Sequence, residues 1–225
     1  MPDLPDARRL SPVAATAHAL VEDPRAVGAS VLAMPASDSK IVEGLRSGEE
    51  WAADALYERV HDVVTQTLRR VLGPGDQELT DVVQEVFERL IVSLSEARLD
   101  EAGKLRAWAA AVATHIGVDL LRSRARRRRL FSFHDGWAEN LSGGGPSLER
   151  RLEARAEMER VRGVLSRMPA SRVETLILHD VLGHSLEEIA TLTHVSGAAA
   201  QSRLVRGRKE LERRLNLERT SGGSR

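Results

Sequence analysis

The sequence SLEEIATLTHVSGAAAQSRLVRGRKELERRL, residues 185–215, decides the fold of this chain. Ser185 and Glu188 have the spacing of a capping box, in which each side chain accepts a hydrogen bond from the other residue's backbone N–H, so a helix begins here. The helical pattern ends at Thr193, and Ser196 offers a second N-cap three residues later. Two helices joined by so short a turn are typical of a helix-turn-helix.

The second of these helices has two different sides at about 100° per residue. One side is expected to pack against the domain and carries Ala200, Leu204, Gly207, Leu211 and Leu215. The other side carries Ala198, Ala199, Ser202, Val205, Arg206 and Lys209, with Gln201 and Arg203 on its flanks. Small residues let a helix approach base edges and cations reach phosphates or guanine, so this side is predicted to bind DNA. The alternative is an amphipathic helix of an ordinary helical core.

The amino-acid composition limits the classes of protein to which this chain can belong. With 225 residues and 42% hydrophobic content, the chain can bury a core, and we expect two small domains. The absence of cysteine excludes disulfides and thiolate metal sites. No apolar run approaches the roughly 20 residues that span a bilayer, and the first residues do not resemble a secretory signal. We therefore expect a cytoplasmic protein.

Formal charge is balanced, with 33 basic and 33 acidic residues, but its distribution is uneven. A dense cationic block comprises Arg122, Arg124, Arg126, Arg127, Arg128 and Arg129. Acidic residues gather instead around residues 76–88 and 149–159. A chain with this distribution can bind DNA with one face and a basic protein with another.

Apolar periodicity predicts an all-α fold with no strand. Before the helix-turn-helix, helices are expected over residues 41–45, 51–72, 81–94 with Thr80 as cap, 104–129, 148–168 and 169–182. The glycine-rich segment GWAENLSGGGPS favours a flexible linker between two helical domains. We expect a disordered tail over residues 1–39, a first domain over 40–130, the linker over 131–147, a second domain over 148–217, and a disordered tail over 218–225.

The helix predicted after Thr80 carries an acidic stripe beside its apolar face. The stripe comprises Asp81, Gln84, Glu85 and Glu88, which recur at three or four residues and so share one side. An ordinary solvent-facing surface is the alternative. Because a basic helix follows the acidic stripe in the sequence, we favour the interpretation that the stripe is a docking surface for a basic protein.

The basic helix, KLRAWAAAVATHIGVDLLRSRARRRR, spans residues 104–129. Its expected apolar stripe comprises Trp108, Val112, Ile116, Leu120 and Leu121. His115 and Asp119 lie four residues apart on one face, where they can hydrogen-bond each other or contact a nucleotide. The arginines that follow lie at the carboxyl end of a helix, where the dipole favours cations. They fit a DNA surface, a general polyanion patch or a nuclear-type basic signal.

Several of these motifs, in this order, resemble a bacterial sigma-70 family factor of the extracytoplasmic function (ECF) type. The resemblance covers roughly residues 40–215. It rests on LYERVHDVVTQTLRRVLG (56–73), DVVQEVFERL (81–90), LRAWAAAVATHIGVDLLRSRARRRR (105–129) and LSRMPASRVETLILHDVLGHSLEEIATLTHVSGAAAQSRLVRGRKEL (165–211). The resemblance implies two small helical domains, sigma regions 2 and 4, joined by a flexible linker.

By this resemblance the chain binds RNA polymerase core and directs promoter recognition, DNA melting and initiation. Asp81, Gln84, Glu85 and Glu88 would bind the clamp helices of the largest polymerase subunit. The minus-ten element would be recognised and melted by His115, Asp119, Arg122, Arg124 and Arg126. The minus-thirty-five element would be bound by the second helix of the helix-turn-helix, through Ala198, Ala199, Gln201, Ser202, Arg203, Arg206 and Lys209. Relatives are often held by an anti-sigma factor, which the resemblance adds as a partner.

Some residues depart from the family pattern. Ala199, Ala200 and Gln201 stand where a Thr-Val-Lys run is common, and this loses a hydroxyl and a cation that would bind phosphate. His115 stands where many relatives have asparagine, and Ala109 replaces the usual leucine after the tryptophan. These changes bear on promoter specificity and not on the overall role.

Other classes of function find little support in the sequence. There is no phosphate-binding glycine loop with its lysine, no nucleophile elbow and no acid–base pair, so we do not expect an enzyme. The histidines lack zinc-site spacing, and we expect no metal and no cofactor. The remaining alternatives are a helix-turn-helix regulator that binds duplex DNA without polymerase, and a divergent polymerase adaptor.

Overall fold

The computed structural model describes residues 36–96, 104–131 and 146–222, and within these ranges every regular element is a helix. The predicted all-α class is confirmed for this part of the chain. The chain divides into two compact units, Met1–Ile116 and Gly117–Arg225. This division falls inside one continuous helix, α5 (Leu105–Phe131). The boundary expected from the sequence is the linker over residues 131–147, of which 132–145 lie outside the described residues.

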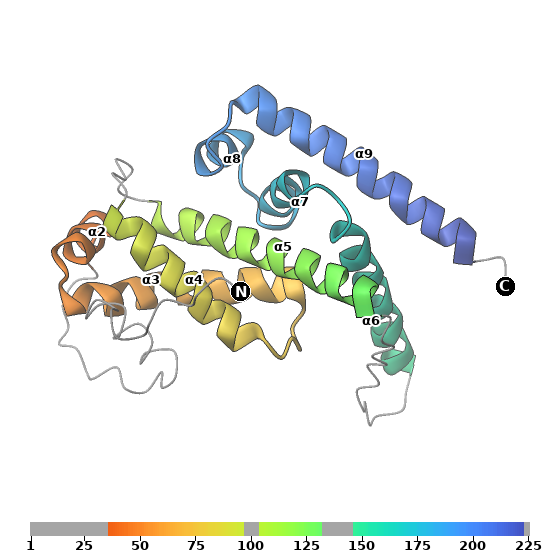
Figure 1. The fold of residues 1–225 in the computed structure, drawn as a ribbon, viewed down its shortest axis with the longest axis horizontal. Coiled ribbons are helices and arrows are strands. Elements are labelled where there is room, and N and C mark those ends of the chain that lie inside the picture. The colour runs from red at the N-terminus through yellow and green to blue at the C-terminus, as the bar shows by residue number, and fades with distance from the viewer. Residues whose placement is uncertain (1–35, 97–103, 132–145, 223–225) are drawn as a thin grey trace. The chain divides into compact units, whose positions relative to one another are not determined.

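The first unit is built on α2 (Asp38–Ser47), α3 (Glu50–Leu72) and α4 (Leu79–Glu96), which pack on one another (Figure 1). Ser37 caps α2 by accepting from the backbone N–H of Lys40, and α3 ends at Leu72 with Gly73 as its C-cap, close to the expected end of the helix. Burial of large side chains holds these helices together. Fully buried members of this core include Ile41, Leu56, Val60, Val64, Leu68, Val86, Leu90 and Leu94.

The start of α5 is fastened to α2 and α3 by polar contacts. The Arg106 guanidinium donates to both carboxylate oxygens of Asp62, at 2.7 and 2.8 Å, and to the Arg59 carbonyl at 2.8 Å. The hydrogen bonds from Arg106 lower the pKa of the Asp62 carboxyl. The Leu105 backbone N–H donates to Asp38 at 3.2 Å. These contacts fix the point from which α5 leaves the first unit.

Two details of the predicted helices differ from the structure. Thr80 lies inside the first turn of α4, because the Asp76 carboxylate accepts from the Glu78 backbone N–H at 3.1 Å and the helix begins at Leu79. The expected apolar stripe of α5 is also displaced, since Trp108, Val112 and Leu120 are only partly buried while Ile116 and Leu121 are buried. Small side chains take much of the buried face instead, namely Ala109, Ala110 and Ala113.

The second unit contains α6 (Pro146–Leu165), α7 (Ala170–Leu176), a π-helical turn η2 (Ile177–Val181), α8 (Leu186–Leu192) and α9 (Gly197–Gly222). The predicted helix over residues 169–182 therefore changes to π geometry after Leu176, where the Leu182 N–H donates to the Ile177 carbonyl. Helix α9 packs on α7 through Gly207, at which an added Cβ would lie 3.1 Å from the Leu176 side chain.

The expected ends of the domains shift where helices continue. Residues 1–35 and 223–225 lie outside the described residues, but α2 already begins at Asp38 and α9 runs on to Gly222. The expected tail over residues 218–225 is thus helical to residue 222. Glu218 accepts from Arg167, and Arg219 donates to Glu157 at 3.3 Å, so contacts with α6 and the turn after it stabilise the last turns of α9. Helix α6 likewise begins at Pro146, within the expected linker.

Alanine substitutions at two helical glycines are expected to change the free energy of unfolding in opposite directions. At Gly44 a Cβ would lie 2.7 Å from the Ala52 Cβ, so Gly44→Ala is expected to lower the free energy of unfolding by about 1 kcal/mol, the crowding cost exceeding the helix-propensity gain. At Gly163 nothing lies within 4 Å of the added atom. Gly163→Ala is expected to raise the free energy of unfolding by up to about 1 kcal/mol. Urea unfolding followed by circular dichroism measures both, and equal signs would contradict the packing at Gly44.

Candidate functional site

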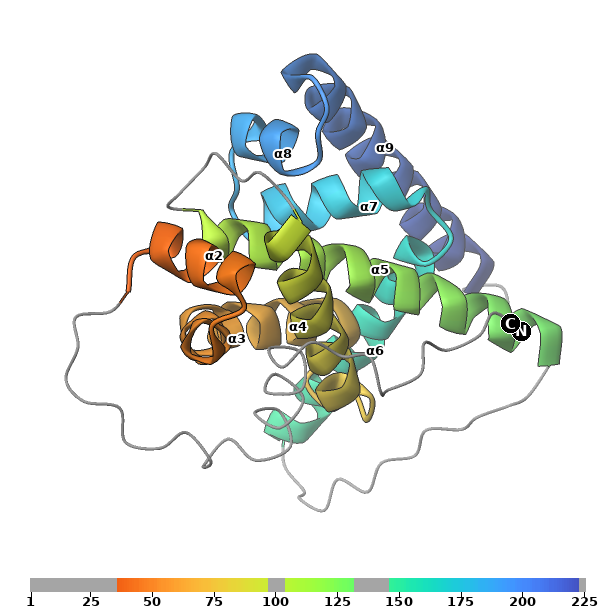
Figure 2. The same cartoon turned by 60° about the vertical axis from the view of Figure 1, so that its left-hand side comes forward.

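The helix-turn-helix forms as the sequence predicts. Ser185 accepts from the Glu188 backbone N–H at 3.2 Å, and the Glu188 carboxylate accepts from the Ser185 N–H at 2.8 Å, which completes the capping box of α8. Ser196 caps α9 by accepting from the Ala199 N–H at 3.2 Å. Between them His194 adopts a φ of 52°, a left-handed conformation that turns the chain within very few residues. Figure 2 shows the short connection from α8 to α9.

The part of α9 from Gly197 to Leu215 presents one packed side and one open side. Ala200, Leu204 and Gly207 are buried, while Leu211 and Leu215 are half-buried, so the predicted packing stripe is confirmed for its first half. On the open side Ala198, Gln201, Val205, Arg206 and Lys209 are exposed. Ala199, Ser202 and Arg203 are half-buried at its edges. All the α9 residues predicted to bind DNA therefore lie on the accessible part of one helix.

An arginine that the sequence analysis did not single out anchors this helix. Arg208 donates from Nε to Asp180 Oδ2 at 3.0 Å, and Asp180 Oδ1 lies 2.8 Å from His179 Nδ1. The hydrogen bond from Arg208 lowers the pKa of the Asp180 carboxyl. Asp180 belongs to the π-helical turn, so this ion pair ties α9 to η2. Helical periodicity predicts that Arg208 lies off the DNA-facing stripe. Periodicity cannot predict that Arg208 pairs with Asp180, which lies 28 residues earlier in the sequence.

The acidic stripe of α4 is an exposed surface. Asp81, Glu85 and Glu88 are exposed and Gln84 is half-buried, and the Gln84 amide donates to Glu88 at 3.1 Å. The stripe continues at Val92, which is 50% exposed one turn beyond Glu88. The structure thus places the four predicted residues together on one side of one helix, with an apolar side chain at the carboxyl end.

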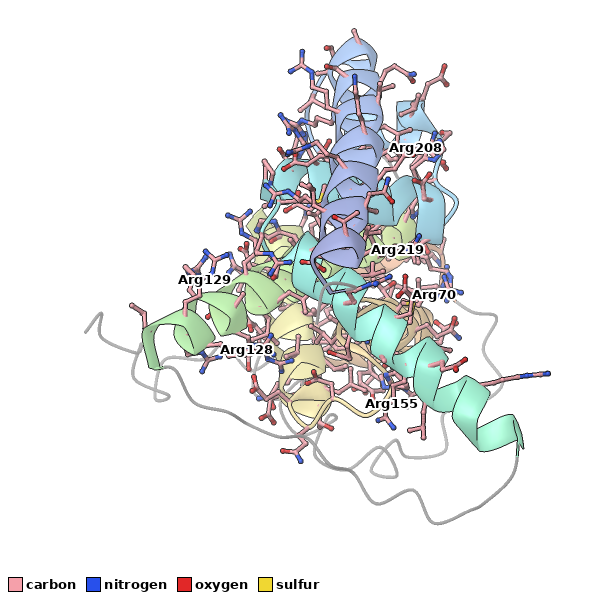
Figure 3. All side chains as sticks on the ribbon, turned by 90° about the vertical axis from the view of Figure 1, so that its right-hand side faces the viewer. Arg70, Arg128, Arg129, Arg155, Arg208 and Arg219 are labelled. Atoms are coloured by element: carbon pink, nitrogen blue, oxygen red, sulfur yellow. The ribbon has the colours of Figure 1, made fainter. Side chains whose placement is uncertain are left out.

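The basic helix carries its predicted residues along α5. His115 and Asp119 are exposed one turn apart, and Arg122 and Arg124 are half-buried. Arg126, Arg127, Arg128 and Arg129 are all exposed, and Figure 3 shows Arg128 and Arg129 extending from the last turns of α5. The carboxyl end of α5 is therefore a concentrated cationic surface.

An aromatic group lies between α3 and α4. The His61 ring stacks on Tyr57 with centroids 4.6 Å apart, and Phe87 lies 4.9 Å from Tyr57. Burial lowers the pKa of the His61 imidazole; Asp62 opposes this effect and Arg69 adds to it. The folded chain therefore holds His61 neutral more strongly than the unfolded chain does.

The lowered pKa of His61 makes stability depend on pH. At pH values well above 6.5 the imidazole is neutral in both states, and as the pH falls through 6.5 the unfolded state binds the proton first. We expect the free energy of unfolding to fall between about pH 7.5 and 5.5 by more in the wild type than in His61→Gln. Urea unfolding at both pH values measures the difference. An identical pH slope in the two proteins would show that His61 is not the group responsible.

Within residues 36–96, 104–131 and 146–222 no helix has the length and apolarity needed to cross a membrane. In the same ranges, histidines and carboxylates nowhere gather in groups of three that could hold a metal ion.

Comparison with known proteins identifies the family. Residues 56–127 match the model of sigma-70 region 2, and residues 158–211 match that of sigma-70 region 4. The chain is 28% identical to the RNA polymerase sigma factor NccH of Alcaligenes xylosoxydans xylosoxydans, over 79% of this chain and 94% of that protein. It is 27% identical to the ECF RNA polymerase sigma-E factor of Escherichia coli K12, over 80% and 94%.

A solved structure has the same fold. CnrH, in complex with the cytosolic domain of CnrY, matches with a TM-score of 0.50 and 23% identity, over 80% of this chain and 97% of CnrH. The two region matches and the similarity to the named RNA polymerase sigma factors show that the chain belongs to the sigma-70 family, as an ECF-type factor. It is an RNA polymerase sigma factor that acts in transcription initiation.

Proposed function

We propose that three separate surfaces divide the work of initiation. The acidic stripe of α4 binds polymerase core at the clamp helices of its largest subunit. The exposed face of α5 recognises and melts the minus-ten element. The exposed face of α9 binds the minus-thirty-five element in the major groove. The observation that carries this proposal is the separation of charge, with four stripe residues on α4 and exposed cations on α5 and α9.

The charges suit these roles. Carboxylates on an exposed helix steer and orient a basic protein partner, whereas arginines and lysines release counterions from phosphates. On α5, His115 and Asp119 would hold unstacked bases while Arg122, Arg124 and Arg126 follow the single-stranded backbone. On α9, Arg203, Arg206 and Lys209 would contact phosphate or guanine beside Ala198, Ala199, Gln201 and Ser202.

The domain limits belong to the same proposal. Residues 40–130 would act as region 2 and residues 148–217 as region 4, joined by the segment over residues 131–147. Because two modules on one chain can bind two sites at a set separation, this division fits recognition of two promoter elements. We further propose a cytoplasmic protein with no catalysis of its own and no cofactor. The CnrH structure includes the cytosolic domain of CnrY, and an anti-sigma partner is proposed here by that similarity.

Run-off transcription tests the function. The purified chain is mixed with polymerase core and a promoter found by mapping transcript starts after overexpression. We expect initiation at that promoter only when the chain is present. Binding to the promoter without core, and no initiation with core, would instead support a regulator that acts without polymerase.

A further inference from the structure

The exposed side of α9 has an apolar side chain at its centre. Val205 is 53% exposed, and it lies on the side opposite Ala200 and Gly207, which are buried against the rest of the unit. At 100° per residue Val205 shares a stripe with Ala198 and Lys209. It is thus placed where the helix faces outward and not where it packs.

Charge is absent from the first two turns of this exposed side. Between Gly197 and Ser202 the helix offers only alanine, glutamine and serine side chains, and the first cations are Arg203 and Arg206. A single exposed valine is common on protein surfaces and needs no explanation by itself. What distinguishes Val205 is its position between Gln201, one turn before it, and Lys209, one turn after it.

The major groove has one apolar feature that such a side chain can read. Thymine carries a C5-methyl group there, and no other base presents a methyl to the groove in unmodified DNA. We propose that Val205 contacts the methyl group of a thymine in the upstream promoter element and makes that position selective for thymine. This inference rests on the proposed binding of α9 to the minus-thirty-five element.

The neighbouring residues support an A·T pair at this position. Gln201 and Val205 lie one helical turn apart on the same side, about 6 Å along the axis, so both side chains would reach neighbouring base edges in the groove. A glutamine amide pairs with the N6 and N7 atoms of adenine, while an apolar side chain suits the thymine methyl. The loss of a methyl contact removes about one buried carbon, which corresponds to an affinity change of about fourfold.

Deoxyuridine provides the test because it differs from thymidine only in lacking this methyl group. The probe is the promoter duplex recovered by transcript-start mapping, with each thymine of the upstream element replaced in turn by deoxyuridine. Holoenzyme assembled from core and the full chain is titrated against each duplex. For the wild-type chain we expect one replacement to weaken binding about fourfold while the others have little effect.

Substitutions at Val205 assign the effect to this side chain. Val205→Ala should bind the thymine duplex several-fold more weakly and show no further loss with deoxyuridine, because the two changes remove one contact. Val205→Thr, which keeps one methyl group, should retain part of the thymine preference. The control is Val181→Ala, which trims a valine that is 49% exposed on the π-helical turn and should leave the wild-type pattern.

The outcomes separate this inference from the function on which it rests. Normal initiation with no deoxyuridine effect, or with an effect that persists in Val205→Ala, would overturn the methyl contact and leave the sigma-factor role in place. If the chain supports no initiation and no core binding, the proposed function fails and the contact fails with it.

Discussion

Glu85→Arg is expected to abolish association with polymerase core. The substitution places a cation in the middle of the acidic stripe of α4, where Glu85 is exposed and flanked by Asp81 and Glu88. Against a basic partner surface, a like charge at an interface costs several kcal/mol, so core affinity should fall by at least about 100-fold. Pull-down or fluorescence titration with purified core measures the loss.

The matched control reverses one exposed carboxylate elsewhere in the same unit. Glu43→Arg on α2 changes the net charge by the same amount and should leave core affinity within about twofold. Glu85 lies on the solvent side of α4, so its replacement should not disturb the buried face of Val86 and Leu90. Equal affinities for wild type and Glu85→Arg would remove the acidic stripe from core binding and would favour a regulator that acts without polymerase.

Neutralising the end of α5 is expected to have the next largest effect. Replacing Arg126, Arg127, Arg128 and Arg129 together by glutamine removes four exposed cations from one helical segment. If these residues neutralise DNA phosphates, the dependence of log affinity on log salt should become shallower by about 3. Affinity for promoter DNA at moderate salt should fall by about two orders of magnitude, because fewer counterions are released on binding. Titration of holoenzyme with promoter DNA at several salt concentrations measures both quantities.

The control for this variant keeps the same net charge. Replacing Lys40, Arg46, Arg69 and Arg70 by glutamine removes four exposed cations from α2 and α3, which the proposal does not assign to DNA. We expect this control to reduce affinity slightly, through net charge alone. Equal losses and equal salt slopes in the two variants would mean that total charge, and not the α5 surface, governs DNA binding.

Local signals in the sequence were sufficient to predict most of the fold. The capping box at Ser185, the cap at Ser196 and the glycine at the end of α3 act through neighbouring backbone groups, so their effects follow from spacing alone. The exposed stripe of α4 follows from periodicity in the same way. These features depend on residues three or four positions apart and require no knowledge of tertiary packing.

Features that depend on distant residues could not be predicted in this way. The π-helical turn, the partial exposure of Trp108 and the extension of α9 to Gly222 each depend on what packs against the helix. Arg208 is one of many arginines in the sequence, and only the fold brings it to Asp180. The roles of individual α5 and α9 residues at the promoter remain predictions, because they depend on contacts with DNA.

The length of α9 has a mechanical consequence. At 1.5 Å per residue its 26 residues make one unbroken rod about 39 Å long, with its proposed reading end at Gly197 and ion pairs from Glu218 and Arg219 near its other end. Because a continuous helix resists bending, a rotation imposed where α6 contacts α9 also tilts the amino-terminal end of α9, which is the end proposed to contact bases. A protein that binds only α6 would then change the base selectivity of α9 without contacting any side chain that faces a nucleotide.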